Sequence, residues 1–482
     1  MVMHNSRRIL RQRATRRTVL ALGPATAATA LATCRPGTAP GGAGEQVGGA
    51  LEKHKPMKFD AWIGTANDRV AQVNAWNQKY PHLEATAAAD VGGQGQQALE
   101  RFTAAIAAGT PPAVAFFDRF QVAAFAIRNV FLPLDDLAKR DKYDWKRHVE
   151  ATLEEARSIV DGKYYAVPAT TDVRFLYWNK DLLEEAGLNA EKGPATWDEF
   201  REYAAKLTKR GGSGIVQLGV HPYRAQMHFN LFAWQNGGGF QTPDGKTATV
   251  NRPENVEALQ WMQTLSRAQG GGQAIRAFEG ERSWTGGQHP FLVNTLALDL
   301  QTNGRLTTIA QYRPDMRFGY AMPPLRKAGD RPLTWSGGHS FVIPQGFSAP
   351  EVAWRFIQFL VSEEGYVVQF EQRKADAAAA GGYVLPTMTT QPDLDQKLFT
   401  RYRTGIQAID DGLKFAVELL KYTRIREPSL AAIAMWDAIH GAPDGAQYHA
   451  VILEDKTAKQ ALDDAQVICQ RALDEAWSTV GK

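Results

Sequence analysis

Cysteine is nearly absent from this chain, which has only Cys34 and Cys469 among its 482 residues. A small domain held together by disulfides is therefore excluded. Disorder and a collagen-like repeat are excluded as well, because 44% of the residues are apolar and 10% are aromatic. A chain of this length and composition can build two hydrophobic cores of ordinary domain size.

The sequence also lacks the short motifs that carry enzyme chemistry. It has no His-Glu-x-x-His or Cys-x-x-Cys motif, no Gly-x-Ser-x-Gly turn and no Walker phosphate loop. His221 and His228 are seven residues apart, but Pro222 breaks the helix that would place them on one face. We therefore expect no metal, no cofactor and no catalysis. A secreted polysaccharide-active enzyme is the alternative from a different class, although no acid/base pair of carboxylates stands out.

Positive charge is concentrated at the N-terminus. The formal net charge is +4, yet residues 1–33 hold six arginines and no acidic residue. The rest of the chain has 49 basic against 51 acidic residues, which is a net charge of −2. Such a near-neutral body lacks the electrostatic surface that binds a phosphate backbone, so we expect no nucleic-acid partner.

Residues 1–33 are typical of an export signal. The pair Arg16-Arg17 precedes a mildly apolar stretch over 19–33, as in a twin-arginine signal, and this stretch is too short to span a bilayer. The four residues that end at Cys34 resemble a lipobox, so we predict that Cys34 is acylated. Membrane attachment is then expected only through this lipid, outside the cytoplasmic membrane. Cleavage by an ordinary signal peptidase is the alternative.

Residues 34–56 are predicted to form a flexible tether. The stretch over 35–50 is rich in Gly and Pro and has almost nothing to bury. The other cysteine, Cys469, shares an apolar stripe of helical spacing with Leu462 and Ala476, so we expect it to be a small buried side chain in a C-terminal helix. No disulfide is expected, because Cys34 is either acylated or removed.

Past the tether, short apolar runs alternate with amphipathic segments, which is the pattern of an α/β chain. The expected strands are 59–63, 113–117, an interrupted run over 167–178, 291–300, 318–322 and 341–343. The expected helices include 70–79, 98–108, 180–186 and 254–268. Two capping boxes, Thr196 with Glu199 and Ser348 with Glu351, predict further helix starts.

Asp118 directly follows the expected strand over 113–117. In open α/β sheets, ligands bind at the carboxyl ends of the strands, so the position favours a ligand contact. The alternative is that Asp118 caps the N-terminus of a helix.

Several longer motifs follow one another along the chain. They are Tyr164–Pro168, Asp172, Leu176–Leu183, Ala186–Leu188, Thr196–Phe200, Trp335–Pro344 and Ala353–Leu360. With these motifs, residues 57 to 477 resemble the extracellular solute-binding proteins of ABC importers, in particular the group that includes maltose- and trehalose-binding proteins. The lipoprotein-like export start agrees with this resemblance independently.

The resemblance implies an α/β, two-lobed periplasmic-binding-protein type II fold, with a hinge and a ligand cleft between the lobes. By this comparison, the N-terminal lobe consists of 57–168 plus 336–376. The C-terminal lobe consists of 172–335 plus 383–482. The crossings between the lobes would lie near 168–172 and 335–337.

The resemblance also implies a ligand site. A sugar presents hydroxyl groups and flat apolar ring faces, so its site needs hydrogen-bonding side chains and aromatic platforms. Asp118 and Asp172 would accept hydrogen bonds from hydroxyls, and Arg424 would donate to them. Trp335 would stack on a ring, beside two glycines that let the backbone approach the ligand. The complete expected set is Trp62, Asp118, Asp172, Trp234, Trp335, Gly337, Gly338 and Arg424.

Each of these positions also has a structural interpretation. Trp62 and Trp234 are more often core residues than platforms, since twelve tryptophans are too many to line one cleft. Asp172 could cap a turn. His339 is expected to be a hydrogen-bonded structural histidine rather than a ligand contact.

Arg424 could pair on the surface with Glu427 or Glu418 instead of binding a ligand. The sequence also departs from the maltose-binding pattern, because Asn303-Gly304-Arg305 stands where a Gly and a Trp platform are expected. Polar groups there would suit a more polar or charged ligand, such as glycerol phosphate, a sugar acid or a peptide. Arg305 and Arg424 would then be the anionic anchors.

The sequence therefore predicts a binding protein without catalysis. Its expected ligand is a small-molecule solute, a mono- or oligosaccharide or a related polyol. Its expected protein partner is the transmembrane permease of an ABC importer, and the protein itself is expected to be a monomer.

Overall fold

The structure is a computed structural model that describes residues 51–91, 95–212, 214–224, 226–441 and 447–480. The predicted export signal, most of the predicted tether and Cys34 lie outside the described residues. Among the helices of the described chain, none is both long enough and apolar enough to cross a membrane.

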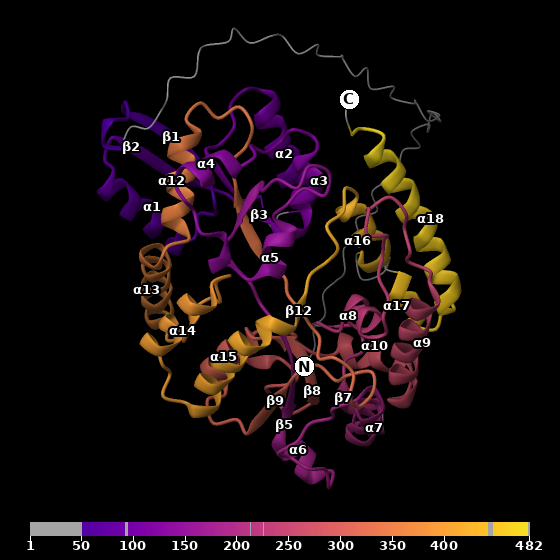
Figure 1. Cartoon of the computed structure of the whole chain (residues 1–482). Coiled ribbons are helices and arrows are strands. Elements are labelled where there is room, and N and C mark those ends of the chain that lie inside the picture. Colours follow the sequence, from indigo (N-terminus) through magenta and orange to yellow (C-terminus); the bar gives the residue numbers. More distant parts are fainter. Residues whose placement is uncertain (1–50, 92–94, 213, 225, 442–446, 481–482) are drawn as a thin grey trace, which may run out of the picture. The chain divides into compact units, whose positions relative to one another are not determined.

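The first lobe is built on a mixed five-stranded sheet with the strand order β2-β1-β3-β11-β4. Figure 1 labels its strands β1, β2 and β3. Its strands are β1 (Met57–Trp62), β2 (Leu83–Ala88), β3 (Val114–Asp118), β4 (Ala166–Pro168) and β11 (His339–Val342). The strands β1, β2 and β3 are parallel, whereas β11 runs antiparallel to both β3 and β4. The chain thus returns late in the sequence to complete its first sheet.

Two hydrophobic cores cover the two faces of this sheet. Side chains alternate along β3, so Phe116 packs into one core with Trp76, and Phe117 packs into the other with Phe102. The first core includes helices α1 (Asn67–Lys79), α12 (Pro350–Leu360) and α13 (Glu363–Ala379). The second core includes helices α2 (Gly95–Ala107) and α3 (Val122–Ala126).

The second lobe is built on another five-stranded sheet, with the order β6-β7-β8-β5-β9. Its strands are β5 (Arg174–Asn179), β6 (Lys209–Gly211), β7 (Gly214–Val220), β8 (Leu296–Thr302) and β9 (Phe318–Ala321). β5 is fully buried and antiparallel to both its neighbours. Phe175 and Tyr177 face one core, while Leu176 and Trp178 face the other.

Helices surround both sheets. Those that pack with the second sheet are α6 (Lys180–Glu185), α7 (Trp197–Leu207), α8 (Phe229–Gln235), α9 (Pro253–Ala268), α10 (Gly272–Gly280), α11 (Arg305–Tyr312), α15 (Gln407–Leu419), α16 (Ala432–His440), α17 (Gln447–Ile452) and α18 (Ala458–Trp477). The other helices are α4 (Asp135–Arg140), α5 (Glu150–Glu155) and α14 (Pro392–Arg401), with 3-10 turns at Leu51–Lys53, Arg119–Gln121, Trp145–Arg147, Gly286–Gln288 and Leu420–Tyr422. Cys469 is free and fully buried in α18, which confirms its predicted place.

The two predicted capping boxes differ in outcome. Thr196 caps α7 as predicted, since its hydroxyl accepts a hydrogen bond from the backbone N–H of Glu199 at 3.3 Å. The prediction for Ser348 is wrong, because α12 begins at Pro350 with Ala349 at the N-cap and no side-chain cap. Proline at the first helical position has no N–H to satisfy and has the helical φ already fixed, so this helix starts without the serine.

The strand expected over 291–300 is also shifted. The structure begins β8 at Leu296, and Asn294 has a φ of 59°. A positive φ interrupts an extended strand, so 291–294 form a turn in which Phe291 and Leu292 are buried and Val293 is exposed.

Three stretches of chain connect the two lobes. The first, 168–174, leads from β4 to β5. The second, 335–339, leads from β10 (Thr334–Trp335) to β11, and β10 pairs in parallel with β12 (Thr423–Arg424). The third, 380–391, leads away from α13 and lies beside the first, because the N–H of Thr171 donates to the carbonyl of Met388 at 3.2 Å. The lobe boundaries expected from the sequence stay a prediction.

Asp395 anchors the third connection. One of its carboxylate oxygens accepts a hydrogen bond from the backbone N–H of Thr389 at 2.7 Å. The other oxygen is buried without a hydrogen-bond partner among the described residues. Burial raises the pKa of this carboxyl to about 7.

We expect Asp395 to make the protein less stable as the pH rises from about 4 to about 7. In the unfolded chain the carboxyl ionises near its ordinary pKa of 3.8, while in the folded chain it stays protonated until about 7, so each step upward favours unfolding. Urea denaturation across this pH range should show a flatter profile for Asp395→Asn. The matched control is Asp393→Asn, at an exposed position of the same helix, which should keep the slope of the parent protein. Equal slopes for all three proteins would contradict the prediction.

Candidate ligand-binding site

A pocket of about 540 Å³ lies between the two lobes, beside the connections. The first lobe contributes Phe116 and Asp118 at the end of β3, and the second contributes Gln226 and His228. Five of the sequence-predicted site residues line this pocket: Asp118, Asp172, Trp335, Gly337 and Gly338. The structure thus brings together groups that are more than 200 residues apart in the sequence. Whether they bind a ligand stays a prediction.

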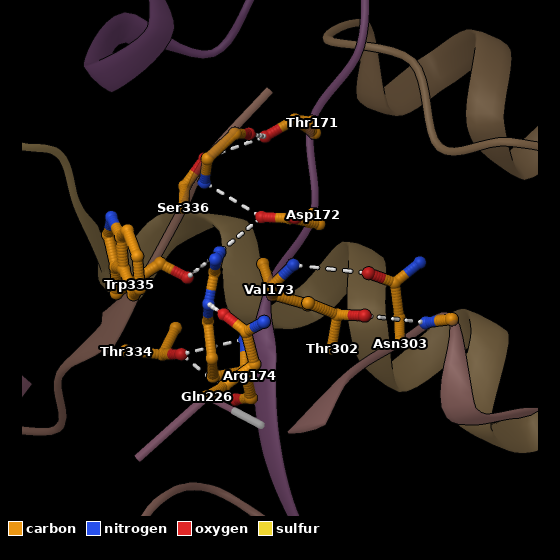
Figure 2. Close-up of polar contacts among 12 residues, drawn as sticks. Thr171, Asp172, Val173, Arg174, Gln226, Thr302, Asn303, Thr334, Trp335 and Ser336 are labelled. Atoms are coloured by element: carbon orange, nitrogen blue, oxygen red, sulfur yellow. Dashed lines mark hydrogen bonds and ion pairs between the residues drawn. The ribbon is translucent and has the colours of Figure 1, made fainter. Parts of the chain in front are cut away.

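Asp172 joins the first and second connections (Figure 2). Its carboxylate accepts a hydrogen bond from the backbone N–H of Gly337 at 2.7 Å and forms an ion pair with Arg174. The side chain of Asp172 is still 32% exposed, so part of the carboxylate faces the pocket. Asp172 therefore links two connections rather than capping a turn, and its role as a ligand acceptor stays a prediction.

Arg174 also lines the pocket, although no sequence pattern singled it out. Its Nε donates to Gln226 at 2.9 Å, and one terminal nitrogen donates to the carbonyl of Trp335 at 3.2 Å. Burial lowers the pKa of Arg174, and the charge of Asp172 opposes that effect. The guanidinium lies 3.7 Å from the centre of the Trp335 ring, whose side chain is only 3% exposed. One face of the predicted aromatic platform is therefore covered by Arg174.

Asp118 also has an arginine partner. The carboxylate accepts a hydrogen bond from Arg426 at 3.2 Å, across a separation of 308 residues. Asp118 stands at the N-cap position of the turn Arg119–Gln121, but its side chain makes no capping hydrogen bond. It is 26% exposed, so an oxygen remains available to the pocket.

A fully buried ion pair, Arg119 with Glu155, lies next to Asp118. Arg119 donates through Nε to Glu155 at 2.9 Å, and neither side chain is exposed. Arg426 approaches the same Glu155 at 3.7 Å and lies 3.9 Å from the centre of the Phe120 ring. Burial raises the pKa of Glu155, while the two arginines hold it down. Each of three carboxylates at this site therefore has an arginine partner: Asp172 with Arg174, Asp118 with Arg426 and Glu155 with Arg119.

The two glycines of the second connection are closely surrounded. Gly338 has a φ of +139°, and a Cβ at this position would lie 2.1 Å from the carbonyl oxygen of Thr170. At Gly337 a Cβ would lie 3.4 Å from both Asp172 and Arg174. The glycines allow the first two connections to pass in contact, which is a structural reason for them besides any ligand approach.

Three of the predicted residues lie outside this pocket. Trp234 and Arg424 line a second pocket, of about 790 Å³, where both bond to the Glu427 carboxylate at 3.0 and 2.8 Å. The ion pair between Arg424 and Glu427 is the alternative that the sequence left open. Trp62 packs against Phe102 with the guanidinium of Arg101 4.6 Å from its ring centre, and it lines neither pocket.

The residues of the polar loop at 303–305 line two different pockets. The amide of Asn303 accepts a hydrogen bond from the N–H of Val173 at 3.2 Å, so it is tied to the start of β5 at the edge of the main pocket. Arg305 is buried, pairs with Asp299 at 2.8 Å and lines a neighbouring pocket of about 280 Å³. As a predicted anionic anchor, Arg305 is therefore already neutralised.

Two histidines of the pocket are held neutral. Burial and the nearby Arg174 and Arg426 lower the pKa of His228 to about 3. Burial also lowers the pKa of His339, whose ring stacks on Phe116 with centres 4.6 Å apart. The pocket therefore offers carboxylates, arginines, amides and neutral imidazoles, which together suit hydrogen bonding to an uncharged polar molecule.

The sequence is similar to several known binding proteins. A family model described as bacterial extracellular solute-binding protein matches residues 63–367. A putative binding protein of Brucella abortus (strain 2308) is 25% identical over 365 residues, which cover 75% of this chain and 82% of that protein. The arabinooligosaccharide-binding protein of Bacillus subtilis (strain 168) is 26% identical over 306 residues, covering 61% and 66%. The sn-glycerol-3-phosphate-binding periplasmic protein UgpB of Shigella dysenteriae is 26% identical over 288 residues, covering 56% and 62%.

Solved structures show the same fold. CpMnBP1 with bound mannobiose has a TM-score of 0.67 at 21% identity, covering 86% of this chain and all of that one. UgpB from Mycobacterium tuberculosis in complex with glycerophosphocholine has a TM-score of 0.62 at 20% identity, covering 88% and 99%. These likenesses confirm the predicted α/β architecture with two lobes.

We expect Gly338→Ala to destabilise the protein by about 1–3 kcal/mol, because the new methyl group would collide with the backbone at Thr170. Gly329→Ala is the matched control, since Gly329 also has a positive φ (+87°) but no atom within 4 Å of a built Cβ. Its cost should be limited to the backbone strain, about 1 kcal/mol. Urea denaturation of both variants separates the two terms, and equal losses would argue against the close contact at Gly338.

Proposed function

The chain belongs to the bacterial extracellular solute-binding protein family, and from this premise we propose that it captures a carbohydrate or related polyol and delivers it to the permease of an ABC importer. Membership of a solute-binding family confirms the prediction of a binding protein without catalysis. The single observation that carries the ligand class is the pair of carboxylates, Asp118 and Asp172, that face one pocket between the lobes.

These carboxylates suit hydroxyl groups rather than a cation. Each is already held by one arginine, Asp118 by Arg426 and Asp172 by Arg174, so their charges are balanced locally. Their remaining lone pairs can accept hydrogen bonds from ligand hydroxyls, each worth about 1.5–3 kcal/mol to a charged group. Gln226 adds an amide at the same pocket. An uncharged, hydroxyl-rich solute satisfies such a site without leaving a buried charge unpaired.

Relatives support the same class of ligand. One relative, from Bacillus subtilis, is named an arabinooligosaccharide-binding protein, and the structure of CpMnBP1 contains bound mannobiose. A pocket of about 540 Å³ has room for a solute of that size.

An anionic solute is the second candidate, and Arg373 is the observation that favours it. This arginine lines the main pocket, and its side chain bonds to the hydroxyl of Thr387. The relative that is named for binding sn-glycerol 3-phosphate also supports an anionic solute. Arg373 replaces Arg305 and Arg424 as the candidate anchor, because those two line other pockets. Competition between glycerol 3-phosphate and the sugars in one titration would separate the candidates.

We propose that the lobes close over the ligand by bending at the three connections. The contact of Asp118 with Arg426 joins residues from both lobes and would break when they separate. The ABC permease is the proposed partner, and the protein would work as a monomer. Closure that produces micromolar binding requires about −8 kcal/mol of net binding free energy, to which charge-assisted hydrogen bonds of about 1.5–3 kcal/mol each would contribute.

We further propose that the N-terminal segment exports the protein and that Cys34 carries the lipid anchor. Cys34→Ser should shift the protein from the membrane fraction to the soluble extracytoplasmic fraction of the producing cells, which immunoblotting of the two fractions would measure. Cys469→Ser serves as the control, because this buried thiol has no part in anchoring. Equal membrane association of the Cys34→Ser variant and the parent would refute the anchor.

Calorimetric titration of the mature protein with a broad sugar and polyol panel should give heat for at least one member. Asp172→Ala should weaken that ligand 10- to 100-fold, or about 1.4–3 kcal/mol, because an acceptor and a lobe-connecting bond are lost. Asp198→Ala removes an exposed carboxylate on α7 and should leave the affinity unchanged. The proposal is wrong if no member of the panel binds, and the placement of the site is wrong if Asp172→Ala binds as tightly as the parent.

A further inference from the structure

The apolar residues that line the main pocket are all buried. They are Phe116, Trp335, Leu385, Pro386, Met388 and Leu413. Phe116 has the largest exposed fraction given for this group, 8%. The surface that a solute meets inside this pocket therefore comes mainly from polar side chains and from the backbone.

The two large aromatic rings of the wall already have partners. Trp335 lies against the guanidinium of Arg174, which also donates a hydrogen bond to the Trp335 carbonyl (Figure 2). Phe116 stacks with the imidazole of His339, and the guanidinium of Arg69 lies 4.5 Å from its ring centre. Neither ring therefore presents an open face on which a flat ligand can stack.

Two amides of the second lobe add donors to this polar wall. The Oδ1 of Asn303 accepts from the N–H of Val173, and the Oε1 of Gln226 accepts from Arg174. The amide nitrogens of Asn303 and Gln226 have no hydrogen-bond partner in the described part of the chain. Both residues line the pocket, so these nitrogens can donate to ligand hydroxyls while the two carboxylates accept from them.

This polar lining distinguishes two kinds of uncharged solute. A pyranose sugar carries its hydroxyls around the edge of a ring and has apolar faces, which gain from contact with an exposed apolar side chain. An open-chain polyol carries a hydroxyl on every carbon and has no such face. Ordering its rotatable bonds costs entropy, so it needs hydrogen-bonding partners along its whole length. A wall that is polar on several sides supplies them.

We propose that the main pocket selects an uncharged open-chain polyol, an alditol, over a pyranose sugar. Arg174 and His339 are the specificity-determining residues, because they cover the rings of Trp335 and Phe116. The proposal rests on the proposed function, since it names the class of solute that the same interlobe site prefers.

Matched alditols and methyl pyranosides test the proposal. The pairs are mannitol with methyl α-mannopyranoside, sorbitol with methyl α-glucopyranoside, and xylitol with methyl β-xylopyranoside. Within a pair the hydroxyl configuration is shared, but the glycoside is locked as a ring. Calorimetric titration of the mature protein should show binding that is tighter for the alditol by about tenfold or more in at least one pair. Binding of the glycoside that equals or exceeds that of the alditol in every pair that binds would overturn the proposal.

His339→Ala tests the reason for the preference. Removing the imidazole uncovers Phe116, so the affinity for the glycoside should rise and the ratio should fall to about threefold or less. The matched control is His82→Ala, in the same lobe, where the ring bonds to the carbonyl of Leu51 and lines no part of the pocket. It should keep the ratio of the parent. Arg174→Ala is less specific, because it also removes the partner of Asp172.

The outcomes distinguish the two levels of inference. An unchanged ratio in folded His339→Ala would overturn the role of the covered ring. If that variant does not fold, which a thermal melt reveals, the ratio in the parent protein still decides. Binding of ring sugars alone, mono- or oligosaccharides, would overturn this inference and leave the proposed function in place. Absence of binding to every sugar and polyol would overturn the proposed function itself.

Discussion

A single buried guanidinium, that of Arg119, fixes the place where the lobes meet. A charge without solvent is tolerated only if its donors are bonded. Arg119 pairs with Glu155 at 2.9 Å, donates to the carbonyl of Thr170 in the first connection, and donates to the carbonyl of Gly337 in the second at 2.9 Å. The relative position of these two connections is thereby set inside the first lobe. The hydrogen bond from Gly337 to Asp172 continues this arrangement into the pocket between the lobes.

The main strands and helices of both lobes could be predicted because their signals are local. Alternating or continuous apolar residues mark β3 and β5, and the side chain of Thr196 caps the helix that follows it. The cluster of Asp118, Asp172 and Gly337 was accessible through family resemblance, since it depends on motifs in a fixed order. Local signals did not predict where β8 begins, because its start depends on backbone conformation. Asn294 has a positive φ, and the strand starts only after it.

The arginines of the site could not be predicted from the sequence. Arg174 begins an apolar strand, and Arg426 lies in a short charged stretch, where an arginine usually faces solvent. Arg426 follows the two-residue strand β12, which pairs with β10, and from there it bonds to Asp118 of the first lobe. Such a contact between distant residues leaves no pattern in either segment. The family resemblance singled out Arg424, two residues earlier, but this residue lines the second pocket.

The three lobe connections also place the two ends of the described chain on different lobes. Because their number is odd, the chain enters through β1 in the first lobe and finishes with α18 on the second. In the proposed closure, an attachment through the segment that precedes residue 51 would restrain the first lobe more directly than the second. A dye attached near the end of α18 would then move with the second lobe. Its distance from a dye on β2 of the first lobe would report the proposed opening and closing.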